Sequence, residues 1–241
     1  MWLGHATVLI EAGGARLLTD PVLRRRVVHL RRHAALPPVP EHLDAVLISH
    51  LHHDHLDPRS LRGLAGRPRV IAPRGAGDLI RKLGFAAEEL EAGGSTDVDG
   101  LRVEAVPAEH DSRRLPLRGP EAEPLGFVIG RSPSVYFAGD TDLLPKMADL
   151  APVDVALLPV AGWGPSLGPG HMNPERAARA VALLQARVAV PIHWGTLHPR
   201  LTRRGEWFST PGEEFARQVA AVAPEAEVRV LRPGESTSVA A

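Results

Sequence analysis

Residues 50 to 55 read His50-Leu51-His52-His53-Asp54-His55 and place four candidate metal ligands within six positions. An apolar run at 45–48 precedes this cluster, and Leu56-Asp57-Pro58 follows it with the pattern of a helix start. The cluster is therefore expected at a turn between a buried strand and a helix, where one loop can direct several side chains to one point. Imidazole and carboxylate groups together suit zinc, iron or manganese.

The side chains of this cluster fall into two sets. Alternation along an extended segment puts His50 and His52 on one side, and Asp54 and His55 come after the turn, where they can serve a second ion. Hydrolytic sites with two ions need such a divided set, because the ions lie about 3.5–4 Å apart. His53 is off the pattern and is expected to point away. The alternative is an accidental His-rich surface turn in a chain that has 12 histidines.

Composition limits the class of protein. A chain of 241 residues with 44% hydrophobic content can bury a sizeable core. Its formal net charge of +0 gives no electrostatic argument for a nucleic-acid partner. The absence of cysteine excludes disulfides, thiolate ligands and a cysteine nucleophile. We find no apolar run of the roughly 20 residues that span a bilayer and no secretory signal pattern, so a cytoplasmic location is expected.

Strand and helix patterns alternate along the chain without a long linker, which favours one layered α/β domain over residues 1–241. Two helices have clear starts, with Asp57 and Asn173 as N-caps and a proline next. Thr210 and Glu213 match a capping box before a third. Strands are expected at 3–11, 15–19, 44–48, 70–72, 101–107, 126–129, 134–138, 154–158, 188–192 and 227–231, and helices at 57–64 and 77–83, from 173, and from 210 to 222.

Three further candidate ligands share one pattern, a strand followed by a polar residue just past its end. They are His110 after 101–107, Asp140 after 134–138 and His193 after 188–192. Strand ends at one edge of a sheet converge, and active sites form there. If Asp140 bridges both ions, one ion has three histidines and an aspartate, and the other has two of each.

Several short motifs occur in the order found in the metallo-β-lactamase fold superfamily, and the chain resembles that superfamily from its first strand to about His198. Within it, the chain looks most like the branch that holds N-acyl-phosphatidylethanolamine phospholipase D and the sugar-phosphate lactonases, with 171–175 pointing to the phospholipase side. The motifs are Gly4-His5-Ala6-Thr7, Thr19-Asp20-Pro21, the cluster at 50–55, Gly139-Asp140-Thr141 and Ile192-His193-Trp194-Gly195-Thr196.

The resemblance implies a four-layer αββα sandwich with two divalent metal ions at one edge. Zinc is the expected metal, and manganese or iron would accept the same side chains. The first ion would be held by His50, His52 and His110. The second would be held by Asp54, His55 and His193, with Asp140 shared.

Five further residues are candidates for supporting roles. Asp20 is expected to hydrogen-bond the cluster turn, and His5 is expected to approach the metal centre. The alternatives are a plain turn aspartate for Asp20 and a core histidine within a strand for His5. His171 is expected to protonate a leaving group or to contact a substrate oxyanion. Arg113 is the candidate for binding a substrate anion. Trp194 is expected to wall the pocket, with core packing as the alternative.

These residues predict a metal-dependent hydrolase acting on ester bonds, of the phosphodiesterase or lactonase type. A hydroxide between the two ions would attack a small soluble substrate, Asp54 or Asp140 would orient it, and His171 would supply a proton. A mononuclear iron enzyme that oxidises thiols or persulfides, a nucleic-acid phosphodiesterase and a non-catalytic binding protein are the alternatives. A homodimer is an open expectation that rests on analogy alone.

A phospholipid substrate would require an exposed apolar patch or amphipathic helix, and none stands out in the sequence. The arginines at 24–26 and 31–32 could attract a phosphate or an anionic headgroup. We expect this stretch to be a solvated loop.

Overall fold

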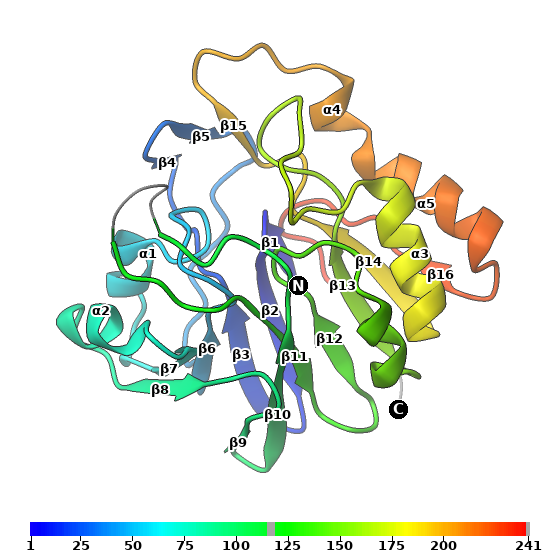
Figure 1. The fold of residues 1–241 in the computed structure, drawn as a ribbon. Coiled ribbons are helices and arrows are strands. Elements are labelled where there is room, and N and C mark those ends of the chain that lie inside the picture. The colour runs from blue at the N-terminus through cyan, green and yellow to red at the C-terminus, as the bar shows by residue number, and fades with distance from the viewer. Residues whose placement is uncertain (115–118, 240–241) are drawn as a thin grey trace.

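Two sheets packed face to face form the centre of the protein in the computed structural model, which describes residues 1–114 and 119–239 (Figure 1). The first sheet has the order β1-β2-β3-β6-β7-β8. Its strands are β1 (Trp2–Gly4), β2 (Thr7–Ala12), β3 (Ala15–Thr19), β6 (Ala45–Leu47), β7 (Arg69–Pro73) and β8 (Ala87–Leu90).

The second sheet has the order β16-β14-β13-β12-β11-β10-β9, and a small third sheet has the order β15-β5-β4. Strands β12, β13 and β14 are parallel, and β9 to β12 form an antiparallel meander. The strands are β9 (Ser95–Val98), β10 (Leu101–Pro107), β11 (Leu125–Ile129), β12 (Val135–Phe137), β13 (Val155–Pro159), β14 (Val188–Ile192) and β16 (Glu227–Val228), with β4 (Arg26–Val27), β5 (Leu30–Arg32) and β15 (Leu197–Pro199) in the small sheet.

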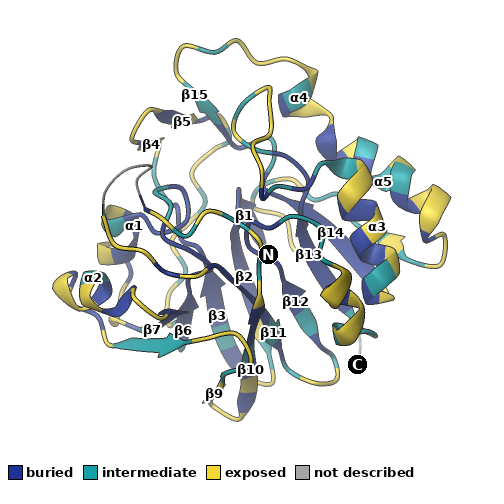
Figure 2. Cartoon of the chain, viewed as in Figure 1, coloured by how far each residue is buried: buried dark blue, intermediate teal, exposed yellow. Residues whose placement is uncertain are grey.

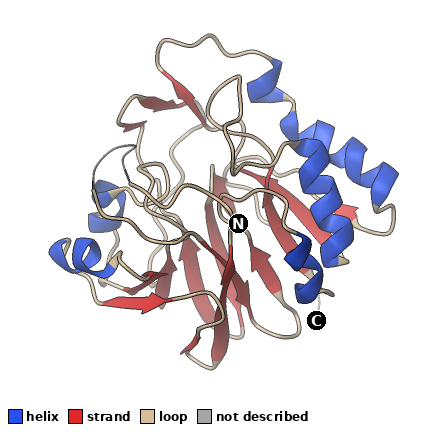
Figure 3. Ribbon diagram, in the orientation of Figure 1, coloured by secondary structure: helices blue, strands red, loops and turns tan. Residues whose placement is uncertain are grey.

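The outer faces of the two large sheets carry the helices (Figure 3). Helices α1 (Pro58–Arg62) and α2 (Gly77–Lys82) lie on the side of the first sheet. Helices α3 (Pro174–Leu184) and α5 (Pro211–Val222) cover the second, together with the 3₁₀ helix η1 (Pro145–Leu150), and the short α4 (Glu206–Ser209) precedes α5. This is the expected αββα sandwich.

Alternation along the buried strands explains the four layers. In β3, Leu17 packs between the sheets while its neighbour Leu18 packs against the helix side. In β14, Val188 and Val190 face the other sheet, and Ala189 faces α3 and α5. Because β14 is buried along its whole length, all five of its residues are apolar, whereas β3 is interrupted by the partly exposed Arg16 and ends at Thr19 (Figure 2).

Helix starts at two positions agree with the sequence, and a third differs. Asp57 accepts a hydrogen bond from the Ser60 backbone N–H at 2.9 Å, and Asn173 accepts one from the Arg176 N–H at 2.8 Å. The capping box at Thr210 was a wrong prediction. Thr210 has φ −108° and ψ −9° because it also ends α4, and its hydroxyl donates to the Glu206 carbonyl instead.

Other expectations need correction. The strand expected at 3–11 is broken into β1 and β2 by a turn at His5, whose φ is 56°, so His5 does not lie within a strand. The polar strands β8 and β9 were not predicted. The stretch 24–40 contains β4 and β5, and Arg32 is buried rather than solvated. The last strand comprises Glu227–Val228 and does not reach 231.

Within the described ranges, no helix combines the length and the apolar character needed to cross a membrane.

The two helix starts allow a matched test of local capping. Asn173→Ala should lower the free energy of unfolding by about 1 kcal/mol, because the Arg176 N–H loses its acceptor. Thr210→Ala should change it by less than about 0.5 kcal/mol, since the Thr210 side chain accepts no hydrogen bond from the first turn of α5 and makes only an exposed bond to the Glu206 carbonyl. Denaturant titration of both variants measures this. Equal losses would contradict the assignment of caps.

Candidate metal centre

All seven candidate ligand residues lie at the same end of the sandwich, at the ends of strands. His50, His52, Asp54 and His55 occupy the turn after β6, and the others follow β10, β12 and β14. Besides a set formed by Asp20, His50 and His55, three sets of side chains have ligand atoms that all lie within 4.8 Å of one another. They are His50, His52 and His110; His5, Asp54, His55 and His193; and His110, Asp140 and His171.

The first set, His50, His52 and His110, directs three imidazole nitrogens to one point. The Nδ1 atom of His52 lies 3.0 Å from the Nε2 atoms of both His50 and His110. The outer nitrogen of His110 can only donate, because its partner is the Gly170 carbonyl at 2.8 Å. Its Nε2 atom therefore carries a lone pair in the neutral ring.

The tautomer of His50 follows from the direction of the hydrogen bond that its neighbour Ser49 makes. The Ser49 hydroxyl donates to the Asp20 carboxylate at 2.5 Å, so it accepts from His50 Nδ1 at 3.0 Å. The Nε2 atom of His50 thus also presents a lone pair. Burial holds the pKa of His50 well below its ordinary value and lowers the pKa of His110 to about 4. Both rings are therefore neutral at pH 7.

The second set places His55 and His193 with their Nε2 atoms 3.2 Å apart. His55 Nδ1 donates to Asp20 at 2.7 Å, and His193 Nδ1 donates to the Ala161 carbonyl at 2.7 Å. In its neutral form, each ring would again present a lone pair to the interior. The Asp54 carboxylate completes this set, 3.7 Å from His55 and 3.9 Å from His193.

Asp140 lies between the two sets. One of its oxygens is 3.2 Å from His55 Nε2 and 3.9 Å from His110 Nε2, and the other is 3.2 Å from His193 Nε2. The Oδ1 atom is buried and receives no hydrogen bond from any described residue. Burial opposes ionisation of Asp140, but the neighbouring His193 and His55 outweigh it and lower its pKa.

These atoms fit a metal cation because they are nearly all acceptors. Lone pairs of buried imidazoles and two carboxylates face one another with too few protons between them, which is unfavourable unless a cation is present. The same demand affects His55: burial opposes its protonation, but Asp140 and Asp20 outweigh burial and raise its pKa well above its ordinary value. The raised pKa means that His55 holds a proton on the nitrogen that faces Asp140, at a position that suits a metal ion.

Asp20 and His5 lie directly behind candidate ligands. Asp20 is fully buried and accepts from the Ser49 backbone N–H at 2.7 Å in addition to the bonds from Ser49 and His55. His5 Nε2 lies 2.9 Å from an Asp54 oxygen, and its ring centroid is 3.8 Å from that of His193. The turn at His5 is what directs its ring to this point.

His171 lies at the more open side of the cluster. Its Nε2 atom is 3.6 Å from Asp140 Oδ2, and its ring meets the His110 ring edge-on at 4.6 Å. Its other nitrogen faces the carbonyls of Gly168 and Pro169. The side chain is 19% exposed, so it has access both to the cluster and to solvent.

Two predicted substrate contacts are not brought to the cluster. Arg113 is an exposed residue that faces Glu121, with Nε 3.8 Å from its carboxylate. Trp194 stacks on Trp2 with centroids 5.8 Å apart and packs against Gly212, where a Cβ would lie 2.4 Å from the indole. Trp194 thus makes packing contacts and also lines a hollow with His33 and Arg204. The roles of Trp194 and Arg113 in substrate binding stay predictions.

Sequence reasoning missed Arg114, which contacts the back of the cluster turn. Its guanidinium donates to the carbonyls of Leu51 and Leu56 and lies 3.1 Å from His53 Nδ1. His53 therefore points away from the other histidines, as predicted. No motif distinguishes Arg114 from Arg113; only the path of the chain buries one and exposes the other.

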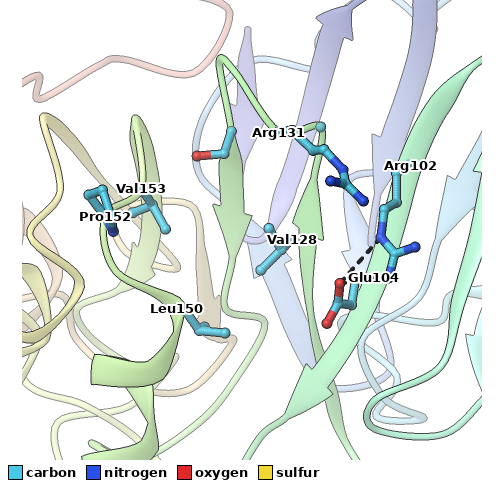
Figure 4. A pocket seen from close by; sticks show the side chains of 9 residues that line it. Arg102, Glu104, Val128, Arg131, Leu150, Pro152 and Val153 are labelled. Atoms are coloured by element: carbon cyan, nitrogen blue, oxygen red, sulfur yellow. Dashed lines mark hydrogen bonds and ion pairs between the residues drawn. The ribbon is translucent and has the colours of Figure 1, made fainter.

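A separate hollow of about 400 Å³ lies on the outer face of the second sheet, away from the cluster (Figure 4). Arg102 bonds Glu104 at 3.0 Å within it, so the two charges compensate each other. It shares no residue with the candidate metal centre, and we assign it no role. It is lined by Arg102, Glu104, Val128, Gly130, Arg131, Ser134, Leu150, Pro152 and Val153.

Comparison with known proteins agrees with this geometry. Residues 15–194 match the model of the β-lactamase superfamily domain. A metal-dependent hydrolase of the UPF0173 family from Methanopyrus kandleri is 35% identical over 98% of this chain and 97% of its own length. An uncharacterized protein of Mycobacterium bovis is 37% identical over 97% of this chain, which spans 67% of that relative.

The fold and the His/Asp cluster define a metal-dependent hydrolase of the metallo-β-lactamase superfamily. Within this superfamily, the chain belongs to the UPF0173 family of metal-dependent hydrolases. Its assignment to the phospholipase D and lactonase branch stays a prediction.

Solved structures at lower identity share the fold. Igni18, a metallo hydrolase from Ignicoccus hospitalis, aligns with a TM-score of 0.69 at 24% identity, over 98% of this chain and 95% of its own. An isothiocyanate hydrolase from Delia radicum gut bacteria aligns at 0.75 and 22%, over 100% and 99%. CmlA, a diiron β-hydroxylase from Streptomyces venezuelae, aligns at 0.72 and 22%, over 95% and 52%. At these identities the likeness concerns the fold alone.

The neighbouring residues Arg113 and Arg114 allow a matched test of whether Arg114 stabilises the cluster turn. Arg114→Met should lower the free energy of unfolding by roughly 2–4 kcal/mol, because it leaves the buried Leu51 and Leu56 carbonyls without a donor. The matched variant Arg113→Met should change it by less than about 0.5 kcal/mol. Denaturant titration in the presence of chelator separates this effect from metal binding. Similar losses in both would contradict the role of Arg114.

Proposed function

We propose that this protein is a two-metal hydrolase that cleaves a lactone, ester or phosphodiester bond of a small molecule. In this proposal, His50, His52 and His110 hold one ion, and Asp54, His55 and His193 hold the other. Zinc is the proposed metal, because neutral imidazoles and carboxylates without thiolates suit it.

The observation that carries the proposal is the place of Asp140 between the two sets of histidines. One carboxylate oxygen lies 3.2 Å from His55, the other lies 3.2 Å from His193, and His110 is 3.9 Å away. A carboxylate in contact with both sets is what a pair of ions needs as a shared ligand. A single-ion site would leave His55, His193 and Asp54 as buried groups without a function.

When bound, the metal ions would lower the pKa of water to roughly 7 and polarise the carbonyl or phosphoryl oxygen under attack. Asp54 and Asp140 can accept a proton from the attacking water, since both are ionised and buried at the centre of the cluster. The hydrogen bonds from His5 to Asp54 and from His55 to Asp20 fix these groups in place, so little reorganisation is needed.

His171 is the proposed proton donor to the leaving group. Its Nε2 atom is directed toward Asp140, and the side chain reaches solvent, from which it can be reprotonated. The substrate is proposed to enter on this side, because His171 and His52 are partly exposed whereas His50, His55 and His193 are buried. Arg113 plays no part in this version of the mechanism, since it faces Glu121.

The proposal predicts about two zinc equivalents per chain and hydrolysis that chelation abolishes. Purified protein is analysed for metal and assayed on bis(p-nitrophenyl) phosphate and on a simple lactone, before and after treatment with chelator. The preferred substrate identifies the bond class. One iron equivalent without hydrolysis would overturn the proposal in favour of the redox alternative.

Adjacent histidines supply the control for this test. His52→Gln should lose at least one metal equivalent and most of the activity, because it removes an inward-facing nitrogen. His53→Gln should keep the full metal content, since His53 faces Arg114. Equal metal loss in both variants would show that any change in this turn disturbs binding and would remove the support for named ligands.

The proton-donor role of His171 predicts a dependence on the leaving group. His171→Gln should lower kcat on an alkyl ester or alkyl phosphodiester by about 10²-fold or more, because an alkoxide must be protonated as it leaves. Activity on the p-nitrophenyl analogue should fall much less, since nitrophenolate leaves without a proton. Equal losses on both substrates, with metal content unchanged, would reduce His171 to a binding contact.

A further inference from the structure

Three loops from distant parts of the sequence meet at the metal end of the protein. They are the β4–β5 hairpin, residues 161–170 between β13 and α3, and residues 200–205 after β15 (Figure 1). The His29 and Trp163 rings meet edge-on at 5.0 Å, and the Arg200 N–H donates to the His29 carbonyl at 3.1 Å. These contacts make the three loops one continuous surface.

One of these loops contacts the candidate metal centre directly. The carbonyls of Ala161 and Gly170, at the two ends of one loop, accept hydrogen bonds from His193 and His110. His171 follows the same loop directly. Whatever binds this surface is therefore brought next to the cluster.

Large apolar side chains project from each of the three loops, and Figure 2 shows much of these loops as exposed. Leu201 is 99% exposed, Val28 is 68% exposed, and Trp163 and Leu167 are each 37% exposed. A single exposed apolar residue needs no explanation, but several on adjoining loop tips indicate an interaction site.

Val28 occupies its exposed position at a conformational cost. It lies in the two-residue turn between β4 and β5 with φ of 48°, where glycine or asparagine is preferred and a β-branched residue is rare. No buried contact explains a valine there, since the side chain is exposed. Strain of this kind at an exposed loop tip is consistent with a role in binding.

The same surface is strongly basic. Residues 21–40, 161–171 and 197–205 contain no aspartate or glutamate. The chain as a whole has a formal net charge of +0, so its charge is unevenly distributed. Six exposed arginines on these loops form no ion pair with a described acidic residue: Arg25, Arg26, Arg31, Arg200, Arg203 and Arg204.

We propose that this apolar–basic surface, made of Val28, Trp163, Leu167, Leu201 and the six arginines, docks on an anionic lipid membrane. Leu201 and Val28 would enter the boundary between headgroups and acyl chains, Trp163 would lie at headgroup level, and the arginines would pair with lipid phosphates. This surface does not stand out in the sequence, because its members come from three distant loops.

Two other occupants fit these observations less well. A second copy in a two-fold dimer would bring the same arginines against each other, which like-charge repulsion opposes. Nucleic acid would pair with the arginines and stack on Trp163, but the aliphatic Leu201 and Val28 at the loop tips would remain unused.

Vesicle sedimentation with the full chain tests the proposal. Vesicles of phosphatidylcholine mixed with an equal amount of phosphatidylglycerol should retain the protein, and phosphatidylcholine alone should retain much less. Arg200→Gln together with Arg203→Gln should lower the partition coefficient by roughly five-fold for each arginine. Leu201→Ser together with Val28→Asn should lower it by about ten-fold. Asparagine tolerates the φ of residue 28, so this variant should fold.

The matched control is Val222→Ser with Arg179→Gln, an exposed apolar residue on α5 and an exposed arginine on α3. This variant should bind vesicles like the parent. Equal binding by all variants, or no preference for anionic lipid, would overturn the proposal. So would retention of a single-stranded oligonucleotide that depends on the arginines and not on Leu201 and Val28. Vesicle binding is measured without metal, so its result is separate from that of the hydrolase proposal.

Discussion

The carboxylate of Asp20 accepts three hydrogen bonds in the interior of the protein, from the Ser49 N–H, the Ser49 hydroxyl and His55 Nδ1. Asp20 follows β3, and Ser49 and His55 belong to the neighbouring turn after β6. These bonds fix the path of the cluster turn relative to the first sheet. Through Ser49 they also fix the tautomer of His50. One histidine of each set, His50 in the first and His55 in the second, thus depends on one buried acid.

This dependence explains why the protein can concentrate so many acceptors at one point. The imidazoles of His50, His55, His110 and His193 are each held from outside by a carbonyl, a hydroxyl or a carboxylate, which restricts their rotation. The rigid shell lies at the ends of strands from both large sheets. A metal would therefore connect the two halves of the sandwich, and folding stability should be linked to metal concentration.

The sequence was sufficient to predict which side chains meet in the cluster, because four of them lie within six residues and the others each follow a strong apolar strand. The sequence was insufficient wherever the local structure depends on contacts with a distant segment. The turn at His5 interrupts an apolar run that reads as one strand, and Thr210 is occupied by the end of α4. Arg113 and Arg114 are identical in sequence terms, yet only Arg114 is buried.

The same limit applies to the surface. Trp163 and Leu201 each stand alone among polar residues, prolines or glycines, and Val28 lies far from both in the sequence, so no local window indicates a patch. The small sheet of β15, β5 and β4 brings two of the three loops together, and its pairing joins residues more than 160 positions apart, such as Arg32 and Leu197. Patterns within one strand cannot predict such pairings.

The loop at 161–170 has one property that follows from its two ends. Its first carbonyl holds a histidine of one set, and its last carbonyl holds a histidine of the other. Any displacement of this loop must rotate both imidazoles together. The two sets of histidines are thus coupled through one loop, and a molecule that displaces Trp163 would shift His193 and His110 together.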